Sequence, residues 1–408
     1  PGGVSLASDN LACRYCSFDS CYGSIFQPQQ SSPATVTLEH CVFRYYWGSV
    51  FLPVSSVQAT ACHVSNVRGI WQMVCGSGSN IENCVFENAR LTSLTNWAGT
   101  DVSIRNSLFG GSDSAMSYYV DLARYSGHFE NNQFRGLRQY SQALEVEVDS
   151  SREAVIAGNI FFDCNHAPGS SGGQLLHIFS DGQIRAFPYL VEENVMTACT
   201  LGDWAMGIWA EDWGVFSRNR LHHLLRSPQH HAPAVYARLF ADSMVFRENV
   251  FYHDSVAMLC EEGLLVDARW NWWGDSTGPY NAISNPNGQG DEVRGNVLFD
   301  SWYPDTSFLM DVPGIGQPLP EQFIFEAYPN PFNNVIHLTL IPSEVQIVKV
   351  ELFDLIGRRV QAIWRGPLAF QKDLTFDASA LSSGIYFARV TDIINRRPLA
   401  ITKLVLLK

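Results

Sequence analysis

The chain has 408 residues, of which 46% are hydrophobic and 16% charged, and its formal net charge is −13. This length exceeds the usual size of one globular core, and the low charge together with 12% aromatic residues argues against a disordered chain. The negative charge argues against nucleic acid or an anionic membrane surface as a partner, and no apolar run reaches the ~20 residues of a membrane-spanning helix.

A short motif recurs between residues 16 and 273 with a period of roughly 20–35 residues. Each copy has an apolar residue at one position and a cysteine, serine or asparagine two residues earlier. The apolar residues are Phe18, Phe43, Val64, Phe86, Phe109, Phe134, Phe161, Met196, Leu221, Phe251 and Trp273. The residues two positions earlier are Cys16, Cys41, Cys62, Cys84, Ser107, Asn132, Asn159, Asn194, Asn219, Asn249 and Asn271. This second position therefore changes from cysteine to asparagine at Ser107.

Apolar and polar residues alternate between the copies, for example over residues 143–149 and 235–240, and this period of two is typical of strands. No helical period occurs there, which argues against leucine-rich repeats. Coils of this length made only of strands and turns predict a parallel β-helix of about eleven coils. Equal positions on successive coils would then stack at ~4.8 Å, so the asparagine side chains should hydrogen-bond along the stack.

The cysteines of the repeated position should be small core residues with free thiols. Disulfides between neighbouring coils are the less favoured alternative, because they require a Cα separation of ~5.5–6 Å and a fixed dihedral angle. A metal site is less favoured still. Only Cys13 and Cys16 form a Cys-x-x-Cys pair, and no histidine lies at ligand spacing from them.

With these repeats, residues 1–303 resemble the right-handed parallel β-helix proteins, a group that includes pectin-active enzymes and many bacterial surface proteins. Residues 270–305 resemble a terminal segment common in secreted members of that group. The resemblance implies the fold but no particular activity, because one fold carries many functions. The first residues correspond to the middle of a coil, so we expect further sequence before Pro1, and any signal peptide to have been removed or to lie there.

Residues 304–322 are rich in proline and glycine and show no periodicity, which is typical of a linker. The segment that follows, residues 323–408, contains six alternating stretches separated by turn residues. This pattern predicts a small antiparallel β-sandwich of the immunoglobulin-like kind. The predicted fold class is therefore all-β, with a β-helix, a linker and a sandwich.

Four motifs of the C-terminal segment stand in order: AYPNPFNN (327–334), LFDLIGRRV (352–360), FDASALSSGIYFARV (376–390) and KLVLLK (403–408). Together they resemble the C-terminal sorting domain of the type IX secretion system. The resemblance implies export to the outer-membrane surface or the medium, with the secretion machinery as a partner and the domain usually removed. It assigns sorting residues as Tyr328, Pro329, Asn330, Pro331, Gly357, Gly384, Tyr386 and Lys408. The alternative is an immunoglobulin-like domain that binds another molecule.

Functional groups of a β-helix are expected on outward strand faces beside long loops. The extra length of three successive coils falls at one corner, in residues 163–174, 197–205 and 223–234. Alternation turns two columns of side chains outward on the adjacent strands. The first column is Tyr119, Glu145, His177, Trp209 and Tyr236, and the second is Asp121, Glu147, Phe179, Glu211 and Arg238. Because sugar faces stack on aromatic rings, Tyr119, His177, Trp209, Tyr236 and Arg238 are the predicted ligand-binding residues, with a polysaccharide as ligand.

Three alternatives stay open for these columns. Glu145, Glu147 and Glu211 supply enough carboxylates for a polysaccharide-active hydrolase or lyase, or for a Ca²⁺ site. The same side chains could serve only solubility and packing in a structural protein, one that assembles head to tail into filaments. A metal site at His222-His223 or His230-His231 is disfavoured, because adjacent side chains diverge, and no other cofactor is expected.

Overall fold

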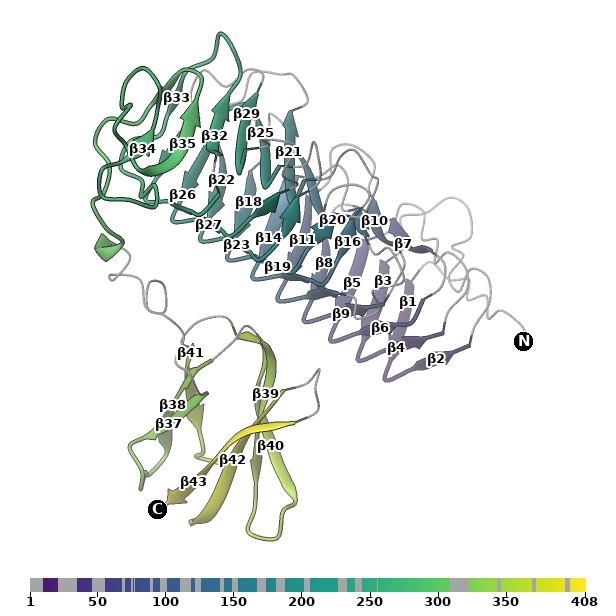
Figure 1. The fold of residues 1–408 in the computed structure, drawn as a ribbon. Helices are drawn as coiled ribbons and strands as arrows, with labels where there is room; N and C mark the ends of the chain where they lie inside the picture. The colour runs from purple at the N-terminus through teal and green to yellow at the C-terminus, as the bar shows by residue number, and fades with distance from the viewer. Residues whose placement is uncertain are drawn as a thin grey trace. The chain divides into compact units, whose positions relative to one another are not determined.

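The computed structural model describes residues 10–20, 35–45, 56–67, 70–74, 76, 78–88, 91–95, 101–110, 119–121, 126–139, 143–148, 153–166, 174–180, 188–201, 206–226, 233–238, 244–254, 256–308, 323–342, 346–368, 372–392 and 397–408. The chain divides into two compact units, Pro1–Phe308 and Leu309–Lys408. Most of the predicted linker, residues 304–322, lies outside the described residues. Each unit is built from β-strands (Figure 1).

The first unit is a parallel β-helix, as predicted, with three long parallel sheets (Figure 1). The first sheet consists of β1 (Asn10–Arg14), β3 (Thr35–Glu39), β5 (Ser56–Thr60), β8 (Ser79–Glu82), β11 (Asp101–Arg105), β14 (Ser126–Glu130), β18 (Ala154–Ala157), β22 (Tyr189–Glu192), β26 (Gly214–Ser217), β30 (Val245–Arg247), β33 (Val266–Asp267) and β36 (Val297–Leu298). The second consists of β2 (Ser17–Asp19), β4 (Val42–Arg44), β6 (His63–Ser65), β9 (Val85–Glu87), β12 (Leu108–Gly110), β15 (Gln133–Arg135), β19 (Ile160–Phe162), β23 (Val195–Thr197), β27 (Arg220–His222) and β31 (Val250–Tyr252). The third consists of β17 (Leu144–Val148), β21 (Leu176–Ser180), β25 (Ile208–Glu211), β29 (Val235–Arg238), β32 (Val256–Cys260), β35 (Gly290–Arg294) and β34 (Pro279–Tyr280).

Two smaller parallel sheets complete the described part of the first unit. One contains β7 (Ile70–Val74), β10 (Leu91–Thr95) and β13 (Tyr119–Asp121), and the other contains β16 (Arg138–Gln139), β20 (Asn165–His166), β24 (Thr200–Leu201) and β28 (Leu225–Arg226). The first sheet has 12 strands, one more than the eleven repeats found in the sequence, because β36 follows the last repeat. That final strand carries no ladder residue, so it left no motif to recognise.

The repeated apolar position lies in the second sheet, with its side chains inside the β-helix. Neighbouring copies pair in register along the whole sheet, from Phe18 opposite Phe43 to Leu221 opposite Phe251. The Phe134 ring stacks on those of Phe109 and Phe161, with centroid distances of 5.2 and 4.6 Å. This column of stacked rings is the contribution of the second sheet to the hydrophobic core.

The asparagine ladder is confirmed and runs from Asn132 to Asn271. From Asn132 to Asn249, each side chain donates from Nδ2 both to the Oδ1 of the next asparagine and to a backbone carbonyl of another coil. Asn159 Nδ2, for example, lies 2.9 Å from Asn194 Oδ1 and 2.7 Å from the Phe129 carbonyl oxygen. Asn194 Oδ1 also accepts the Asn159 backbone N–H at 3.0 Å. The ladder thus satisfies backbone groups at the bend between the first and second sheets, where they would otherwise be buried without partners.

The residue just before each ladder position adopts a left-handed conformation. Its φ is +55° at Tyr15, +55° at Asn83 and +54° at Arg218, and a glycine, Gly158, takes the place in another coil with a φ of +63°. A left-handed residue turns the chain sharply between two strands, and side chains other than glycine resist it at a cost of ~1–2 kcal/mol. The ladder hydrogen bonds that follow each bend help to offset this cost.

Cysteine thiols take the place of asparagine in the first four coils. Cys41, Cys62 and Cys84 are buried and Cys16 is half-buried. The Sγ of Cys62 donates to the Leu38 carbonyl oxygen at 3.4 Å, as the asparagines do on later coils. The cysteines within the described residues all carry free thiols: Cys13, Cys16, Cys41, Cys62, Cys84, Cys164, Cys199 and Cys260.

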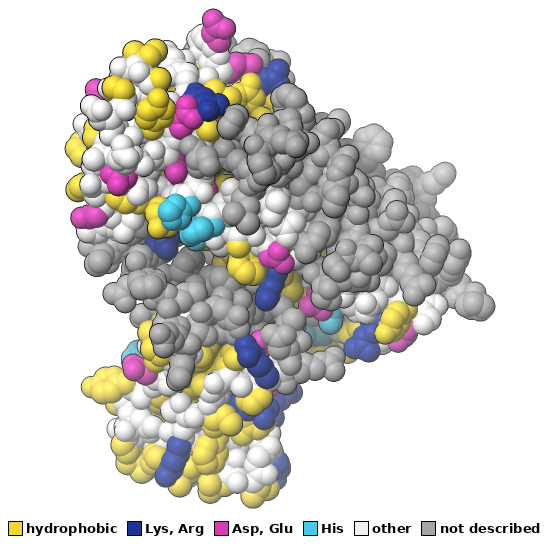
Figure 2. Space-filling view, viewed as in Figure 1, with side chains coloured by type: hydrophobic (Ala, Val, Ile, Leu, Met, Phe, Trp, Pro, Cys, Tyr) yellow, Lys and Arg dark blue, Asp and Glu magenta, His cyan; other side chains and the backbone are white. Residues whose placement is uncertain are grey.

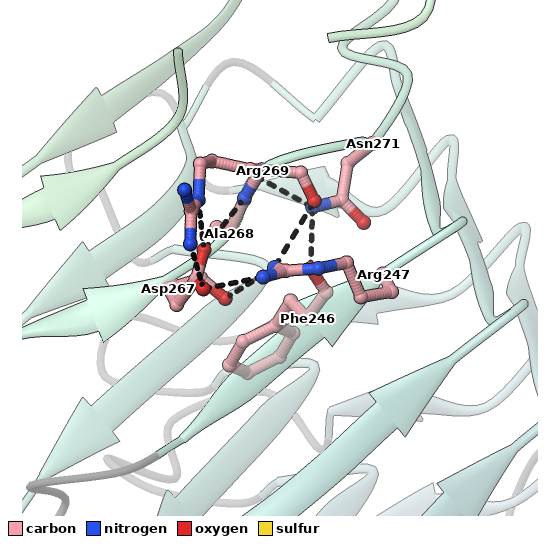
Figure 3. A network of polar contacts seen from close by, with 6 residues as sticks. All are labelled: Phe246, Arg247, Asp267, Ala268, Arg269 and Asn271. Carbon is pink, nitrogen blue, oxygen red and sulfur yellow. Dashed lines mark hydrogen bonds and ion pairs between the residues drawn. The ribbon is translucent and has the colours of Figure 1, made fainter. Parts of the chain in front are cut away.

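A polar network closes the ladder at the last coils (Figure 3). The Asp267 carboxylate accepts hydrogen bonds from Arg269 Nε and Nη2 at 2.9 and 2.8 Å, and from Arg247 Nη2. The pKa of Asp267 lies well below its usual range, mainly because of the hydrogen bonds from Arg269. Burial acts in the opposite direction, and the bond from Arg247 lowers the pKa further. Asn271, the last ladder residue, donates instead to the Ala268 and Phe246 carbonyls at 2.7 and 3.0 Å. The Ala268 carbonyl therefore takes the place of the Oδ1 of a next asparagine, while the bond to the Phe246 carbonyl matches those of the earlier ladder residues.

The second unit contains two antiparallel sheets with a core of its own, as predicted. One sheet orders β37 (Ile324–Tyr328), β38 (Val335–Ile341) and β41 (Lys372–Asp377), and the other orders β40 (Arg359–Leu368), β39 (Gln346–Phe353), β42 (Gly384–Asp392) and β43 (Pro398–Leu406). Buried residues of both sheets, such as Leu338 and Val350, share one hydrophobic cluster. The alternation seen in the sequence thus corresponds to a sandwich with one face of each sheet inside.

Candidate functional site

The outward side chains of the third sheet form a column across four consecutive strands. Glu145 on β17 pairs in register with His177 on β21, His177 with Trp209 on β25, and Trp209 with Tyr236 on β29. All four side chains are half-buried, whereas their strand neighbours such as Leu144 are fully buried in the core. We call Glu145, His177, Trp209 and Tyr236 the outer strip.

The rings of the outer strip contact one another. The His177 and Trp209 ring centroids are 5.2 Å apart, and those of Trp209 and Tyr236 are 5.6 Å apart in an edge-to-face arrangement. Trp209 Nε1 donates to Glu211 Oε1 at 3.2 Å, and the Arg238 guanidinium carbon lies 5.4 Å from the Trp209 ring centroid. Trp209 is therefore the centre of the strip, held in place by side chains of its own strand and of the strands on either side.

Charged groups flank the rings on both sides. Glu145 Oε2 lies 3.8 Å from His177 Nδ1, and Arg238 Nε lies 3.3 Å from Glu261 Oε1. Burial, followed by the charge of Glu261, raises the pKa of Tyr236, and its phenol, protonated at neutral pH as phenols are, lies within hydrogen-bonding reach of Glu261. The strip thus offers ring surface together with donors and acceptors.

The remaining predicted site residues lie beside the strip or apart from it. In the second column, Glu147 pairs with Phe179, and Glu211 pairs with Arg238. Tyr119 and Asp121 lie on β13, which pairs with β10 in a separate small sheet. Within the described residues the strand pairing of the third sheet begins at β17, so the place of Tyr119 at the start of the column stays a prediction.

The lengthened corner beside the strip is only partly described. The predicted segments 163–174, 197–205 and 223–234 begin with the short strands β20, β24 and β28, and their middle parts lie outside the described residues. These two-residue strands were not predicted, because a pair of residues is too short to show a period. They add a short fourth sheet between the second and third sheets of these coils.

Histidine side chains gather near the last coils of the first unit (Figure 2). His222 Nδ1 lies 3.0 Å from His223 Nδ1, and the His223 ring centroid is 5.1 Å from that of His253. Burial, with the charges of His223 and Arg220, lowers the pKa of His222 to about 4. Among the described residues, no group of three or more His, Cys, Asp or Glu side chains is arranged to hold a metal ion. His230-His231 lies outside the described residues.

The proline-rich motif of the second unit holds the last strand in place. Asn330 donates from Nδ2 to the Lys403 carbonyl at 2.7 Å and accepts the Val405 N–H on Oδ1 at 2.9 Å. The Phe332 N–H donates to the Val405 carbonyl at 2.9 Å, and the Leu407 N–H donates to the Phe332 carbonyl at 2.8 Å. Tyr328-Pro329 and Asn330-Pro331 are cis peptide bonds that frame Asn330. The motif therefore extends the sheet edge as a strand would.

The other motif residues shape turns or fix the end of the chain. Gly357 has a φ of +80° in the turn after β39, where Asp354 Oδ1 accepts the N–H groups of Ile356 and Arg358 at 3.0 and 2.9 Å. Gly384 begins β42, and the Tyr386 hydroxyl donates to the Ser382 carbonyl at 2.9 Å. The Lys408 N–H donates to Ser383 Oγ at 2.9 Å. Sequence reasoning identified these residues by their motif, and the structure adds what each one contacts.

Sequence analysis missed a buried carboxylate in this unit. The Glu351 side chain, 5% exposed, lies 2.8 Å from Lys349 Nζ and 3.1 Å from Arg359 Nη1, with Arg389 Nη2 at 3.8 Å. Burial alone would raise its pKa, but the hydrogen bonds from Lys349 and Arg359 outweigh burial, so the pKa of Glu351 is lowered. An outward-facing strand position gave no signal that three cations would surround it.

The Glu351→Gln variant is expected to lower the free energy of unfolding of the second unit by about 1–2 kcal/mol at neutral pH, since the partner cations are partly exposed. Because the folded pKa is depressed, the stabilisation is present above the unfolded pKa and disappears as the pH falls through the folded value. Thermal unfolding followed between pH 7 and pH 3 should therefore bring wild type and variant together at low pH. A difference that persists at the lowest pH would contradict this account.

Comparisons with known proteins concern the second unit. Residues 326–404 match the family described as "Secretion system C-terminal sorting domain". No curated protein matches the chain in sequence. In the part of the chain that the structure describes, there is no helix with the length and hydropathy needed to cross a membrane. The match, the order of the motifs and the antiparallel sheets agree. The chain carries a type IX sorting domain C-terminal to a parallel β-helix, and the protein is exported to the cell surface or the medium.

Proposed function

We propose that the exported β-helix is a surface scaffold that contacts a glycan through the outer strip. The observation that carries the proposal is the register of His177, Trp209 and Tyr236 on three consecutive strands. Rings repeated at the strand spacing of ~4.8 Å offer an extended, partly apolar surface to a chain of sugars. Parallel strands hold these side chains rigidly, so little conformational entropy is lost on binding.

The carboxylates near the strip support binding more than cleavage. Glu211 orients Trp209 through the hydrogen bond to its indole, and Glu145 lies beside His177. Glycoside hydrolysis needs one carboxyl group that donates a proton and a second that attacks or activates water. With Glu211 engaged by an indole N–H, its contribution is to position a ring. We therefore place catalysis by Glu145, Glu147 and Glu211 second to binding.

The Trp209→Ala variant is expected to weaken binding of the glycan at least ~10-fold, because aromatic residues at the centre of a contact dominate its energy. A glycan array with the full-length protein would identify the ligand, and calorimetry on the best hit would give the affinities. Trp270→Ala is the matched control, since Trp270 is 47% exposed on the last coils and lies outside the strip. Equal affinity of wild type and Trp209→Ala would refute the placement of the site.

The same measurements separate the alternatives. Shorter sugar products that disappear in Glu147→Gln would favour a polysaccharide-active enzyme. Absence of any glycan ligand, together with filaments in negative-stain micrographs, would favour a purely structural protein that assembles head to tail.

A further inference from the structure

The cysteine column places thiols directly opposite each other on successive coils, with Cys62 between Cys41 and Cys84. Cys62 and Cys84 lie between two pairs in register, Thr60 opposite Glu82 and His63 opposite Val85. Their Cα atoms are therefore separated by the strand spacing of ~4.8 Å, inside the ~4.4–6.8 Å range of disulfides. Both residues are buried, with 4% and 1% of their surface exposed. The β-helix thus holds the two sulfur atoms in one enclosed place.

The two thiols differ in their acidity. A hydrogen bond from Cys84 is the largest cause that lowers the pKa of Cys62, against the opposing effect of burial. The same hydrogen bond, followed by burial, raises the pKa of Cys84. Since the thiolate is the nucleophile in disulfide chemistry, Cys62 is the member of the pair that reacts first.

The destination of the protein supplies the oxidising conditions. Export to the cell surface or the medium takes the chain out of the reducing cytosol, into compartments where disulfides form and persist. Thiols that stay reduced inside the cell therefore meet disulfide oxidants during and after export. Cys62 and Cys84 are opposed closely enough to react with each other there.

We propose that Cys62 and Cys84 form a disulfide that links two successive coils once the protein meets a small disulfide oxidant. The Cys62 thiolate attacks one sulfur of the oxidant, which breaks the oxidant's S–S bond and releases one thiolate. The Cys84 thiolate then attacks Cys62 Sγ in the mixed disulfide and releases the second thiolate. Two cysteine thiols are oxidised, one oxidant disulfide is reduced to two thiols, and the two cysteine protons end on the released thiolates.

Oxidised glutathione tests this proposal on the full-length protein. After reduction, the protein is incubated with oxidised glutathione, alkylated and digested with trypsin without further reduction. Arg68 separates the peptides of Cys62 and Cys84, so mass spectrometry can identify them joined. We expect the joined peptides to accumulate with time, and fragmentation to place the bond at Cys84. The midpoint of urea unfolding should rise in the oxidised protein, because a cross-link restricts the unfolded chain.

Variants test the order of the two steps. In Cys84→Ser, the second attack is removed, so glutathione should remain attached to Cys62 as a mixed disulfide. Cys260→Ser removes a buried cysteine of another column and should leave the Cys62–Cys84 bond unchanged. Cys16, which is half-buried, reports whether the oxidant is active. Glutathione on Cys16 without any Cys62–Cys84 bond, or a bond from Cys62 to Cys41 in the wild type, would overturn the proposal.

Discussion

The Asn194→Ala variant is expected to lower the free energy of unfolding of the β-helix by about 3–5 kcal/mol. Asn194 is 1% exposed and sits in the middle of the ladder. Its Oδ1 accepts the Asn159 N–H at 3.0 Å and Asn159 Nδ2 at 2.9 Å. Its Nδ2 donates to the Ile156 carbonyl at 2.8 Å and to Asn219 Oδ1 at 2.9 Å. Alanine removes this partner from the Asn159 N–H and the Ile156 carbonyl, and it takes one of two hydrogen bonds from Asn159 Nδ2 and from Asn219 Oδ1. An unsatisfied buried group costs ~1–3 kcal/mol.

Urea unfolding of the full chain, followed by circular dichroism, measures this effect. Asn296→Ala is the matched control, because Asn296 is exposed on the last coil and outside the ladder. The Ser107→Asn variant provides a second test, since it extends the ladder toward Cys84, whose N–H now donates to Ser107 Oγ at 3.1 Å. A loss in Asn194→Ala no larger than in Asn296→Ala would show that the ladder contributes little to stability.

The Phe134→Ala variant is expected to cost about 3–5 kcal/mol of the free energy of unfolding through a cavity in the core. The Phe134 ring is 1% exposed and is stacked between two other rings, 5.2 Å from Phe109 and 4.6 Å from Phe161. Backbone hydrogen bonds between neighbouring coils hold these strands at a fixed spacing, so the coils above and below cannot close the gap. Removing the ring therefore loses both its burial and its contacts on two faces.

The control for this variant is Phe162→Ala, a phenylalanine beside Phe161 that points away from the core. Phe162 is half-buried under the Arg135 guanidinium, whose carbon lies 5.7 Å from the ring centroid. We expect its replacement to cost less than about 1 kcal/mol. Equal denaturation midpoints for the two alanine variants would contradict the conclusion that the buried Phe134 ring stabilises the core.

The parts of the fold that repeat were predictable from the sequence, because repetition turns one weak signal into many. A single phenylalanine two residues after a small polar residue does not indicate any particular fold. The same pair at Phe109, Phe134 and Phe161 specifies a stack, and the structure brings these rings together. The left-handed bend before each ladder residue escaped prediction, because residues as different as Tyr15, Glu193 and Trp270 occupy it. The bend imposes the left-handed conformation on whichever residue stands there, so no residue type recurs at this position for a sequence pattern to show.

Contacts between columns of the outer face were beyond sequence reasoning for a different reason. Alternation identified Trp209 and Arg238 as outward residues, but it gave no information on which way each long side chain bends. In the structure Arg238 lies both over the Trp209 ring and beside Glu261, which follows the next strand. Tyr119 stays a predicted member of the column, because β13 pairs with β10 and contacts β17 without pairing with it as a strand. Pairing between strands depends on the whole coil and not on the strand alone.

The sequence by itself determined the repeating coil, the ladder position and the sorting domain, since each rests on residue types at regular spacing or on an ordered set of motifs. Only the tertiary structure decided which side chains meet. The column from Glu145 to Tyr236 was predicted by alternation, but the ring contacts within it, the contact of Arg238 with Trp209 and the cations around Glu351 are known only from the structure. The physical reason is that regular spacing shows which positions face each other on successive strands, whereas the contacts of each long side chain depend on how it bends against neighbours from other strands.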